Sequence, residues 1–185
     1  MANLPTGAVT FLFTDIEGST QLWEKQPEVM KTALANHDSI LRECIESSHG
    51  YIIKNTGDGI HAAFERAIDA INAAILVQHK INSSLPLRVR IGLHTGEAEL
   101  RDGDYYGSVL NRAARLMSVA HGGQILISNA TAELVYDGLP SNTTMQDMGE
   151  HRLKDLVRPE RIFQIAHVDL QSDFPPIKSL DAFPN

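Results

Sequence analysis

Two aspartates stand where the chain turns sharply, and they are the residues best suited to hold a metal ion. Asp15 ends the apolar run 9–15, and Asp58 lies in the glycine-rich segment 55–59 between two strand-like runs. If the strands that carry them are neighbours, the two carboxylates converge at one edge of a sheet. Oxygen ligands of this kind suit Mg²⁺ or Mn²⁺. The simpler alternative is that both aspartates serve turns, because Asp-Gly is a common turn sequence.

The residues that follow the first aspartate predict a phosphate-binding helix start. Gly18 bends the chain, and Ser19 or Thr20 can cap a helix whose first backbone N–H groups are free to bind phosphate. Carboxylates beside a phosphate site indicate metal-assisted phosphoryl chemistry. In such chemistry two ions about 4 Å apart stabilise the attacking and leaving oxygens.

Four further polar residues could complete such a site, although each also has an ordinary explanation. Asn111 and Arg115 share one face of a predicted helix, opposite apolar residues at 110, 113, 114 and 117, and could hold a sugar and a charged phosphorus centre. Taken by themselves, these two residues are better explained by a solvated polar face. Lys54 stands in an apolar strand, which an edge position would explain. Asp104 lies in a predicted turn and is ambiguous by itself.

The elements that must position these residues alternate between strands and helices, with hairpins among them. Strands are predicted at 9–15, 51–54, 60–64, 87–100 with a break at 95–96, 124–128, 145–148 and 162–165. Helices are predicted after residue 18 with an interruption at Pro27, and at 67–81, 108–120 and 129–138. The alternation favours a mixed α/β or α+β fold around one sheet.

Composition narrows the class of protein. The 185 residues suit a single domain, predicted over 1–168, with a Pro-containing C-terminal tail or linker over 169–185. A net charge of −7 argues against a protein that coats nucleic acid, and no apolar run is long enough to span a membrane. A single cysteine excludes an intrachain disulfide and a cysteine-built zinc site. We therefore expect a reduced, cytoplasmic protein.

Other catalytic signatures find no match. The sequence lacks the phosphate-loop, dinucleotide-binding, zinc-protease and serine-hydrolase motifs. His37 and His94 lie in apolar elements, so we expect them to be packed structural residues rather than ligands.

Taken together, three ordered motifs resemble the catalytic domain of the class III nucleotidyl cyclases, which convert ATP or GTP into a cyclic monophosphate. The motifs are Phe13–Thr20, Lys54–Gly59, and Asp104–Gly107 followed by Asn111 and Arg115. The resemblance extends from about residue 9 to 164, and the Glu-Gly-Ser-Thr of the first motif is similar to the bacterial branch. The fold predicted on this basis is α+β, an α/β sandwich. Its ferredoxin-like or palm-type βαββαβ core has a mixed, mainly antiparallel sheet flanked by helices.

The resemblance implies roles at the metal and at the purine. Asp15 and Asp58 match the two metal-binding aspartates, with the Ile16 carbonyl as a further ligand of two divalent cations, Mg²⁺ or Mn²⁺. Lys54 and Asp104 match the pair that reads the purine. Lysine can donate to adenine N1 and aspartate can accept from the N6 amino group, whereas guanine would leave both mispaired. We therefore expect an adenylyl cyclase that acts on ATP.

The resemblance also implies how the rest of the substrate is held. Asn111 matches the residue that positions the ribose, and Arg115 matches the one that stabilises charge on the α-phosphate. Lys154, in the looser segment 151–156, is placed to bind the β- and γ-phosphates. The active sites of the family lie between two catalytic domains, so a homodimer is expected in which the aspartates of one chain face the other groups of its partner. The tail resembles linkers to C-terminal regulatory domains.

Three alternatives stay open at this point. One is a cyclase with relaxed ATP/GTP choice, and another is a non-catalytic cyclase-like module that binds nucleotide or dimerises. A palm-type polymerase or diguanylate cyclase shares the two-carboxylate metal logic. The chain lacks the Gly-Gly-Asp/Glu-Glu-Phe signature, and its acidity disfavours a template channel.

Overall fold

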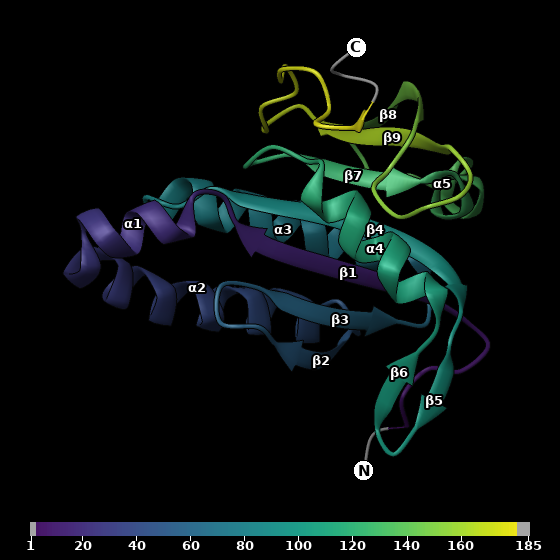
Figure 1. Ribbon diagram of the computed structural model, residues 1–185, viewed down its shortest axis with the longest axis horizontal. Helices are drawn as coiled ribbons and strands as arrows, with labels where there is room; N and C mark the ends of the chain where they lie inside the picture. Colours follow the sequence, from purple (N-terminus) through teal and green to yellow (C-terminus); the bar gives the residue numbers. More distant parts are fainter. Residues whose placement is uncertain (1–2, 181–185) are drawn as a thin grey trace.

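A seven-stranded sheet dominates the computed structural model, which describes residues 3–180 (Figure 1). The strand order is β2-β3-β1-β4-β7-β9-β8. Of these neighbouring pairs, β4 and β7 run parallel and the others are antiparallel. The strands are β1 (Ala8–Ile16), β2 (Tyr51–Asn55), β3 (Ile60–Phe64), β4 (Val89–Glu97), β5 (Glu99–Arg101), β6 (Asp104–Tyr106), β7 (Ile125–Ser128), β8 (Thr143–His151) and β9 (Glu160–His167).

Five helices accompany the sheet, and the chain order reproduces the predicted core. The helices are α1 (Ser19–Lys25), α2 (Pro27–Ser47), α3 (Ala67–Ser84), α4 (Ser108–Ser118) and α5 (Asn129–Val135). From β1 to β4 the elements follow the βαββαβ pattern with strand order β2-β3-β1-β4, the ferredoxin-like arrangement. The predicted α+β fold with a mixed, mainly antiparallel sheet is therefore confirmed.

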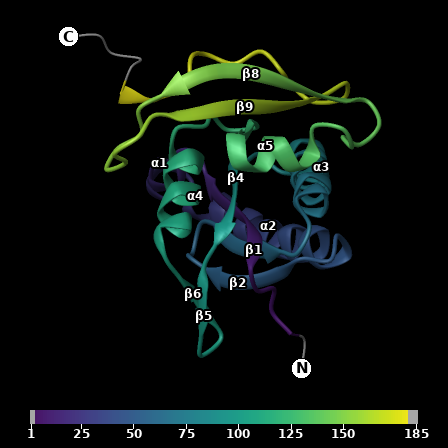
Figure 2. The ribbon, with the colours of Figure 1, turned by 90° about the vertical axis from the view of Figure 1, so that its right-hand side faces the viewer.

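The helices lie on both faces of the sheet (Figure 2). Helices α2 and α3 cover one face, where Leu12 and Ile16 of β1 join the largest hydrophobic cluster. The opposite face carries α4, where Phe11 and Phe13 pack with Ala113. Because side chains alternate along a strand, Asp15 shares the face of the two phenylalanines. The first candidate aspartate therefore lies on the α4 face.

Two glycines of β4 mark where α4 approaches the sheet rather than where the strand ends. The predicted break at 95–96 is wrong, since β4 continues to Glu97, with Gly96 opposite Val9. A Cβ at Gly96 would lie 2.9 Å from a side-chain carbon of Val109, and one at Gly92 would lie 2.5 Å from the backbone nitrogen of Met117. Close packing of a helix on a strand explains both residues.

The helix predicted at 108–120 presents a different apolar face from the one expected. The structure buries Val109, Ala113 and Leu116, whereas the predicted positions 110, 114 and 117 are only half-buried. The fully buried residues are three and four apart and pack on the sheet. The half-buried ones lie toward the side of the helix that carries Asn111.

A two-stranded hairpin extends from the main sheet and was not predicted beyond its turn. Strands β5 and β6 pair only with each other and form the arm below α4 in Figure 1. Asp102 and Gly103 both have positive φ, which suits a tight hairpin turn. The Tyr105 hydroxyl donates to the Pro5 carbonyl at 2.7 Å, and its ring meets Phe11 edge-on. The arm is thereby fixed against the N-terminal segment and β1.

The segment after β9 has no regular helix or strand up to residue 178, yet it lies on the domain. Ile177 is buried in a cluster with Val119 and Leu153, and the backbone N–H of Lys178 donates to the Val119 carbonyl. The domain boundary at 168 stays a prediction, and residues 181–185 of the predicted tail lie outside the described residues. Among the helices between residues 3 and 180, none combines the length and the apolar character that crossing a membrane requires.

Candidate active site

The two candidate metal-binding aspartates lie side by side because the β2–β3 hairpin is pressed against the end of β1. The backbone N–H of Ile16 donates to the Asp58 carbonyl at 3.0 Å, and the Thr14 hydroxyl accepts from the Ile60 N–H. A Cβ on Gly59 would lie 1.9 Å from the Thr14 carbonyl oxygen, closer than any side chain tolerates. Glycine is thus required for this approach.

An arginine that the sequence reasoning did not single out holds the first aspartate. Arg90 stands directly opposite Asp15 in the β1–β4 pair, and its guanidinium donates to both carboxylate oxygens, with 2.5 Å from Nε to Oδ1. It also donates to the Ser118 carbonyl at the end of α4. Its bond to Asp15 raises the pKa of Arg90, helped by the charges of Asp15, Glu17 and Asp58. A charged residue inside an apolar strand was the signal that could have revealed it.

The donor set around the aspartates fits a hard divalent cation. It consists of two carboxylates and the neighbouring backbone carbonyl of Ile16, all of them oxygen ligands. Asp58 Oδ2 accepts from the Ser19 hydroxyl at 2.9 Å, and each carboxylate oxygen keeps a second lone pair. Arg90 faces both Asp15 and Asp58, whereas Glu17 is paired with the Lys178 ammonium at 3.6 Å. The type of ligand therefore suits Mg²⁺ or Mn²⁺.

The helix start at 18–20 differs from the prediction in its capping. Gly18, with φ of 70°, is the N-cap of α1, and no side chain caps the helix. The prediction that Ser19 or Thr20 would cap it is wrong. Ser19 instead orients Asp58, as described above, because its hydroxyl reaches that carboxylate rather than a backbone N–H. Thr20 is exposed in the first turn.

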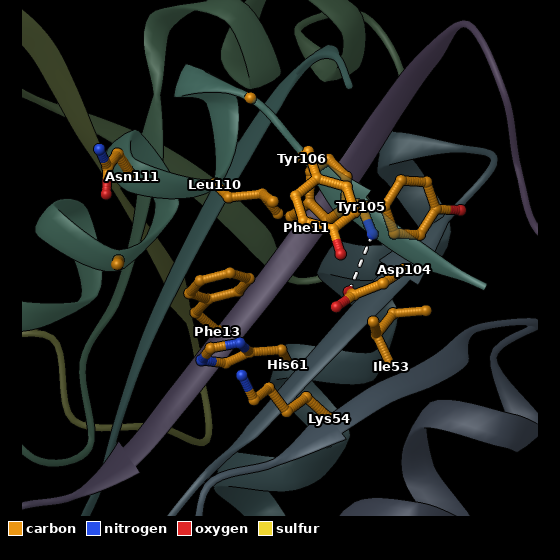
Figure 3. Close-up of a pocket in the computed structure, with 12 residues that line it drawn as sticks. Phe11, Phe13, Ile53, Lys54, His61, Asp104, Tyr105, Tyr106, Leu110 and Asn111 are labelled. Carbon is orange, nitrogen blue, oxygen red and sulfur yellow. Dashed lines mark hydrogen bonds between the residues drawn. The ribbon is translucent and has the colours of Figure 1, made fainter. Parts of the chain in front are cut away.

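A separate pocket of about 410 Å³ gathers three of the predicted substrate groups (Figure 3). Lys54 reaches it from β2, Asp104 from β6 and Asn111 from α4. Its apolar walls include Phe11 and Phe13. The volume falls within the range of about 300–1,000 Å³ of small-molecule sites. A lysine donor and a carboxylate acceptor therefore flank one largely apolar pocket.

A β-bulge in β2 turns the lysine toward this pocket. The register of β2 against β3 shifts between Ile52 and Lys54, so that Lys54 rather than Ile53 stands opposite His61. His61 in turn stands opposite Phe13 of β1. The bulge thus completes a row of three side chains across three strands. Strand β2 is an edge strand, as the lysine predicted.

His61 is a pocket residue that sequence reasoning missed. Its ring stacks on Phe13 with the centroids 3.6 Å apart, and the Lys54 ammonium lies beside it in Figure 3. Burial lowers the pKa of His61, the charge of Lys54 lowers it further, and the charge of Asp104 opposes both effects. The charges of both groups predicted to read the purine therefore act on this ring. Its neighbours Phe13 and Lys54 lie on other strands, so no local sequence motif indicated that His61 belongs to the pocket.

The two remaining candidates lie outside the residues that line the pocket. Arg115 donates to the Asp155 carboxylate at 2.6 Å, and Lys154 is the exposed neighbour of Asp155 in the chain. The ion pair brings the segment that carries Lys154 to the C-terminal half of α4. The roles of Arg115 and Lys154, like those of the other candidates, stay predictions.

The chain belongs to the adenylate and guanylate cyclase catalytic domain family, because the model of that family matches residues 1–165. An uncharacterized protein of Mycobacterium tuberculosis is 44% identical over 182 residues, which are 97% of this chain and 63% of that protein. The chain thus spans less than two thirds of that relative. An adenylate cyclase of Podospora anserina is 30% identical over 87% of this chain and 10% of its own length.

A solved structure of similar fold comes from the same class of protein. An adenylate cyclase of Trypanosoma brucei, described in its monomeric state, superposes with a TM-score of 0.82 and 27% identity, covering 96% of this chain and 95% of that one. The predicted resemblance to the class III cyclases is confirmed.

Proposed function

We propose that this domain is an adenylyl cyclase, which converts ATP into 3′,5′-cyclic AMP and pyrophosphate. One observation supports it above the others: Lys54 and Asp104, from different elements, flank a single apolar pocket. On the same face of the sheet lies Asp15, held beside Asp58. Family membership and the similarity to adenylate cyclases point the same way.

The choice of ATP follows from hydrogen-bond chemistry at the pocket. The Lys54 ammonium donates only, which suits adenine N1, and the Asp104 carboxylate accepts only, which suits the N6 amino group. Guanine presents a ring N–H and a carbonyl oxygen at these places, so both pairs would fail. The aromatic wall that Phe13 contributes offers a surface for a base to stack on.

The other residues of the proposal hold the sugar and the phosphates. Asn111 positions the ribose so that its 3′-oxygen attacks the α-phosphorus. One oxygen–phosphorus bond forms, the bond to pyrophosphate breaks, and the hydroxyl proton leaves to water. Arg115 stabilises the charge on the α-phosphate, and Lys154 binds the outer phosphates. Asp15 and Asp58 would hold Mg²⁺ or Mn²⁺, with the Ile16 carbonyl as a further ligand. When bound there, the metal lowers the pKa of the 3′-hydroxyl and offsets the charge of the triphosphate.

The proposal includes a homodimer with two equivalent active sites, each built from both chains. In this arrangement Asp15 and Asp58 of one chain face the pocket groups and Arg115 of its partner, and Arg115 exchanges its ion pair with Asp155 for the phosphate. Half-buried Leu110 and Ala114, together with exposed Tyr106, leave an apolar pocket rim for a second copy to cover. A cytoplasmic location and further regulatory domains in a longer chain complete the proposal.

The decisive experiment incubates the purified chain with ATP or GTP and Mn²⁺ or Mg²⁺, and measures cyclic nucleotide and pyrophosphate. We expect cyclic AMP in excess over cyclic GMP. Comparable rates with both substrates would favour relaxed purine choice. Pyrophosphate without a cyclic product, or no turnover with either metal, would refute a cyclase.

Mixing two inactive variants tests the shared sites. Asp15→Ala removes a metal ligand and Arg115→Ala removes the phosphate contact, so each homodimer should be inactive. Random pairing makes half of the dimers mixed, each with one intact site of two, and about a quarter of wild-type activity should return. If mixing restores nothing while both variants still dimerise, each site lies within one chain.

A further inference from the structure

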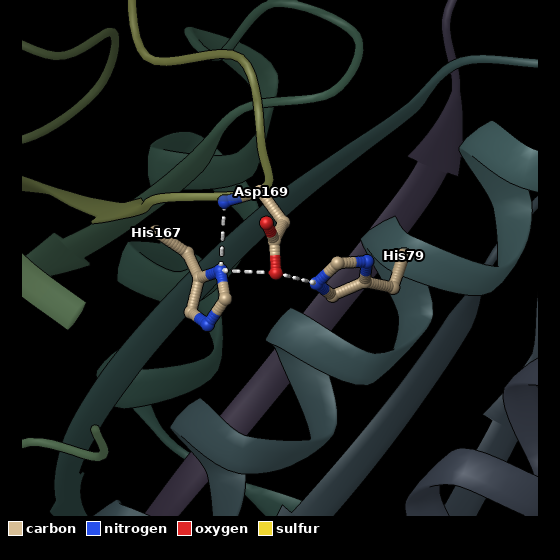
Figure 4. Close-up of side chains that lie close together, drawn as sticks. All are labelled: His79, His167 and Asp169. Carbon is tan, nitrogen blue, oxygen red and sulfur yellow. Dashed lines mark hydrogen bonds and ion pairs between the residues drawn. The ribbon is translucent and has the colours of Figure 1, made fainter. Parts of the chain in front are cut away.

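Two histidines and an aspartate, none of them among the residues proposed for the cyclase site, lie close together (Figure 4). His79 comes from α3, His167 ends β9, and Asp169 follows in the next turn. Asp169 Oδ2 lies 4.0 Å from Nε2 of His79 and 4.0 Å from Nδ1 of His167. Both separations are too long for hydrogen bonds. The three ligand atoms therefore lie near one another, within 4.8 Å, without bonding directly.

The structure already orients these groups toward one another. The two imidazole rings meet edge-to-face with their centroids 5.3 Å apart. The backbone N–H of Asp169 donates to Nδ1 of His167 at 3.1 Å, which leaves that nitrogen without a proton and facing the cluster. The His167 side chain is only 13% exposed, whereas that of Asp169 is 67% exposed. One ligand is therefore held firmly, and an exposed one can close the site.

We propose that His79, His167 and Asp169 form a second metal site, which binds a transition-metal dication of the Zn²⁺ type. Imidazole nitrogen with one carboxylate is a donor set that suits Zn²⁺ and disfavours Mg²⁺. Tetrahedral zinc with bonds of about 2.0–2.1 Å brings its ligand atoms to about 3.3 Å from one another. The two 4.0 Å separations must therefore contract by about 0.7 Å, which the exposed carboxylate permits. The two imidazole nitrogens, which lie within 4.8 Å of each other, must also approach, and the His79 side chain, 38% exposed, has room to turn.

Binding would displace one existing hydrogen bond and leave an open position on the metal. The lone pair of His167 Nδ1 would pass to the metal, and the exposed N–H of Asp169 would turn to water. Three protein ligands leave the fourth position to water, as in open zinc sites.

The site connects elements that are distant in the sequence. It joins α3, which packs on the sheet, to the end of β9 and the turn that begins the segment 169–180. That segment carries Lys178, whose ammonium lies 3.6 Å from the Glu17 carboxylate near the cyclase aspartates. The metal would tie this segment to the domain where it leaves the last strand. This inference does not rest on the proposed cyclase activity.

The test measures Zn²⁺ binding to the full, metal-free chain by calorimetry, in excess Mg²⁺ so that the oxygen ligands of Asp15 and Asp58 are occupied. Co²⁺ is the second probe, because its visible absorption separates tetrahedral nitrogen-containing sites from oxygen-only octahedral ones. We expect one Zn²⁺ per chain, a tetrahedral Co²⁺ spectrum and a higher melting temperature with Zn²⁺.

The variants keep the shape of the side chains that they replace. His79→Gln preserves a polar atom near Nε2, and His167→Asn preserves the acceptor for the Asp169 N–H. Each should weaken Zn²⁺ binding by more than about tenfold, because even outer-shell partners of a metal site are worth about 10–100-fold. His49→Asn, which removes an exposed histidine elsewhere, is the matched control and should bind as the wild type does.

Two outcomes would overturn the proposal. One is a wild-type chain that binds no Zn²⁺ in excess Mg²⁺, and the other is a His79→Gln/His167→Asn double variant with unchanged affinity. If the histidine variants fail to fold, Asp169→Asn decides, because this side chain is 67% exposed and the substitution keeps its size. Unchanged Zn²⁺ affinity in that variant would show that the Asp169 carboxylate is not a ligand and would refute the proposed site.

Discussion

The stability of the domain should fall in acid because of one buried histidine on β4. His94 is 7% exposed, and its Nδ1 lies 2.6 Å from the Ser128 hydroxyl. Burial lowers the pKa of His94 to about 4, with the charge of Arg112 acting in the same direction. In the unfolded chain the pKa of histidine is about 6.5. Between pH about 4 and pH about 6.5, His94 is therefore protonated in the unfolded chain and neutral in the folded one.

The sign and size of the effect follow from this difference. The free energy of unfolding should be independent of this group above pH about 6.5 and should fall as the pH drops toward about 4. The full difference corresponds to about 3 kcal/mol, and about 2 kcal/mol of it is lost by pH about 5. A histidine that charges only on unfolding therefore costs stability in acid.

Denaturant unfolding of the wild type and of His94→Gln at pH about 7.5 and pH about 5 measures the effect. Glutamine keeps a polar side chain but does not titrate, so the variant should lose about 2 kcal/mol less than the wild type between the two conditions. Each protein is its own control, because any packing cost of the substitution is present at both pH values. Equal losses in the two proteins would refute the assignment to His94.

Three further predictions concern the site. Lys54→Ala should lower the ratio of cyclic AMP to cyclic GMP formation by about tenfold or more, whereas Lys31→Ala, an exposed lysine on α2, should leave it unchanged. An unaltered ratio in Lys54→Ala would argue against purine reading by this residue. Gly59→Ala should lower the free energy of unfolding by about 2 kcal/mol or more, because the added Cβ would meet the Thr14 carbonyl. Gly138→Ala is the control, since a Cβ there meets open space, and equal losses of stability in the two variants would contradict the steric explanation. Tyr105→Phe should cost about 1 kcal/mol in denaturant unfolding by removing the hydrogen bond to Pro5, and an unchanged midpoint would count against that bond.

Local patterns were sufficient to predict much of the site. The apolar run that ends in Asp15, and the glycines around Asp58, predicted one carboxylate at a strand end and one at a hairpin tip, and the structure brings these two segments together. The edge position of β2 supplies the ordinary explanation for a lysine in an apolar run. These features depend on residues that are close in the sequence, where strand and turn preferences act directly.

What the sequence missed depends on pairing between distant segments. Arg90 meets Asp15 only because β4 lies antiparallel to β1 in one register, and His61 reaches the pocket only because a bulge aligns it with Lys54. The glycine at 96 was interpreted as a break because its reason, the approach of α4, comes from another element. Such effects require the register and the packing, which no window of sequence contains.

The β5–β6 arm links the N-terminal segment to the pocket that is proposed to bind the purine. Leu4 packs in the same cluster as Phe11, and the Pro5 carbonyl accepts a hydrogen bond from the hydroxyl of Tyr105, the immediate neighbour of Asp104. The N-terminal segment therefore supports the wall that carries Asp104. A force applied to this segment would act on the pocket rather than directly on Asp15 and Asp58, the proposed metal ligands. In the proposed enzyme, substrate choice would then respond to this segment independently of metal binding.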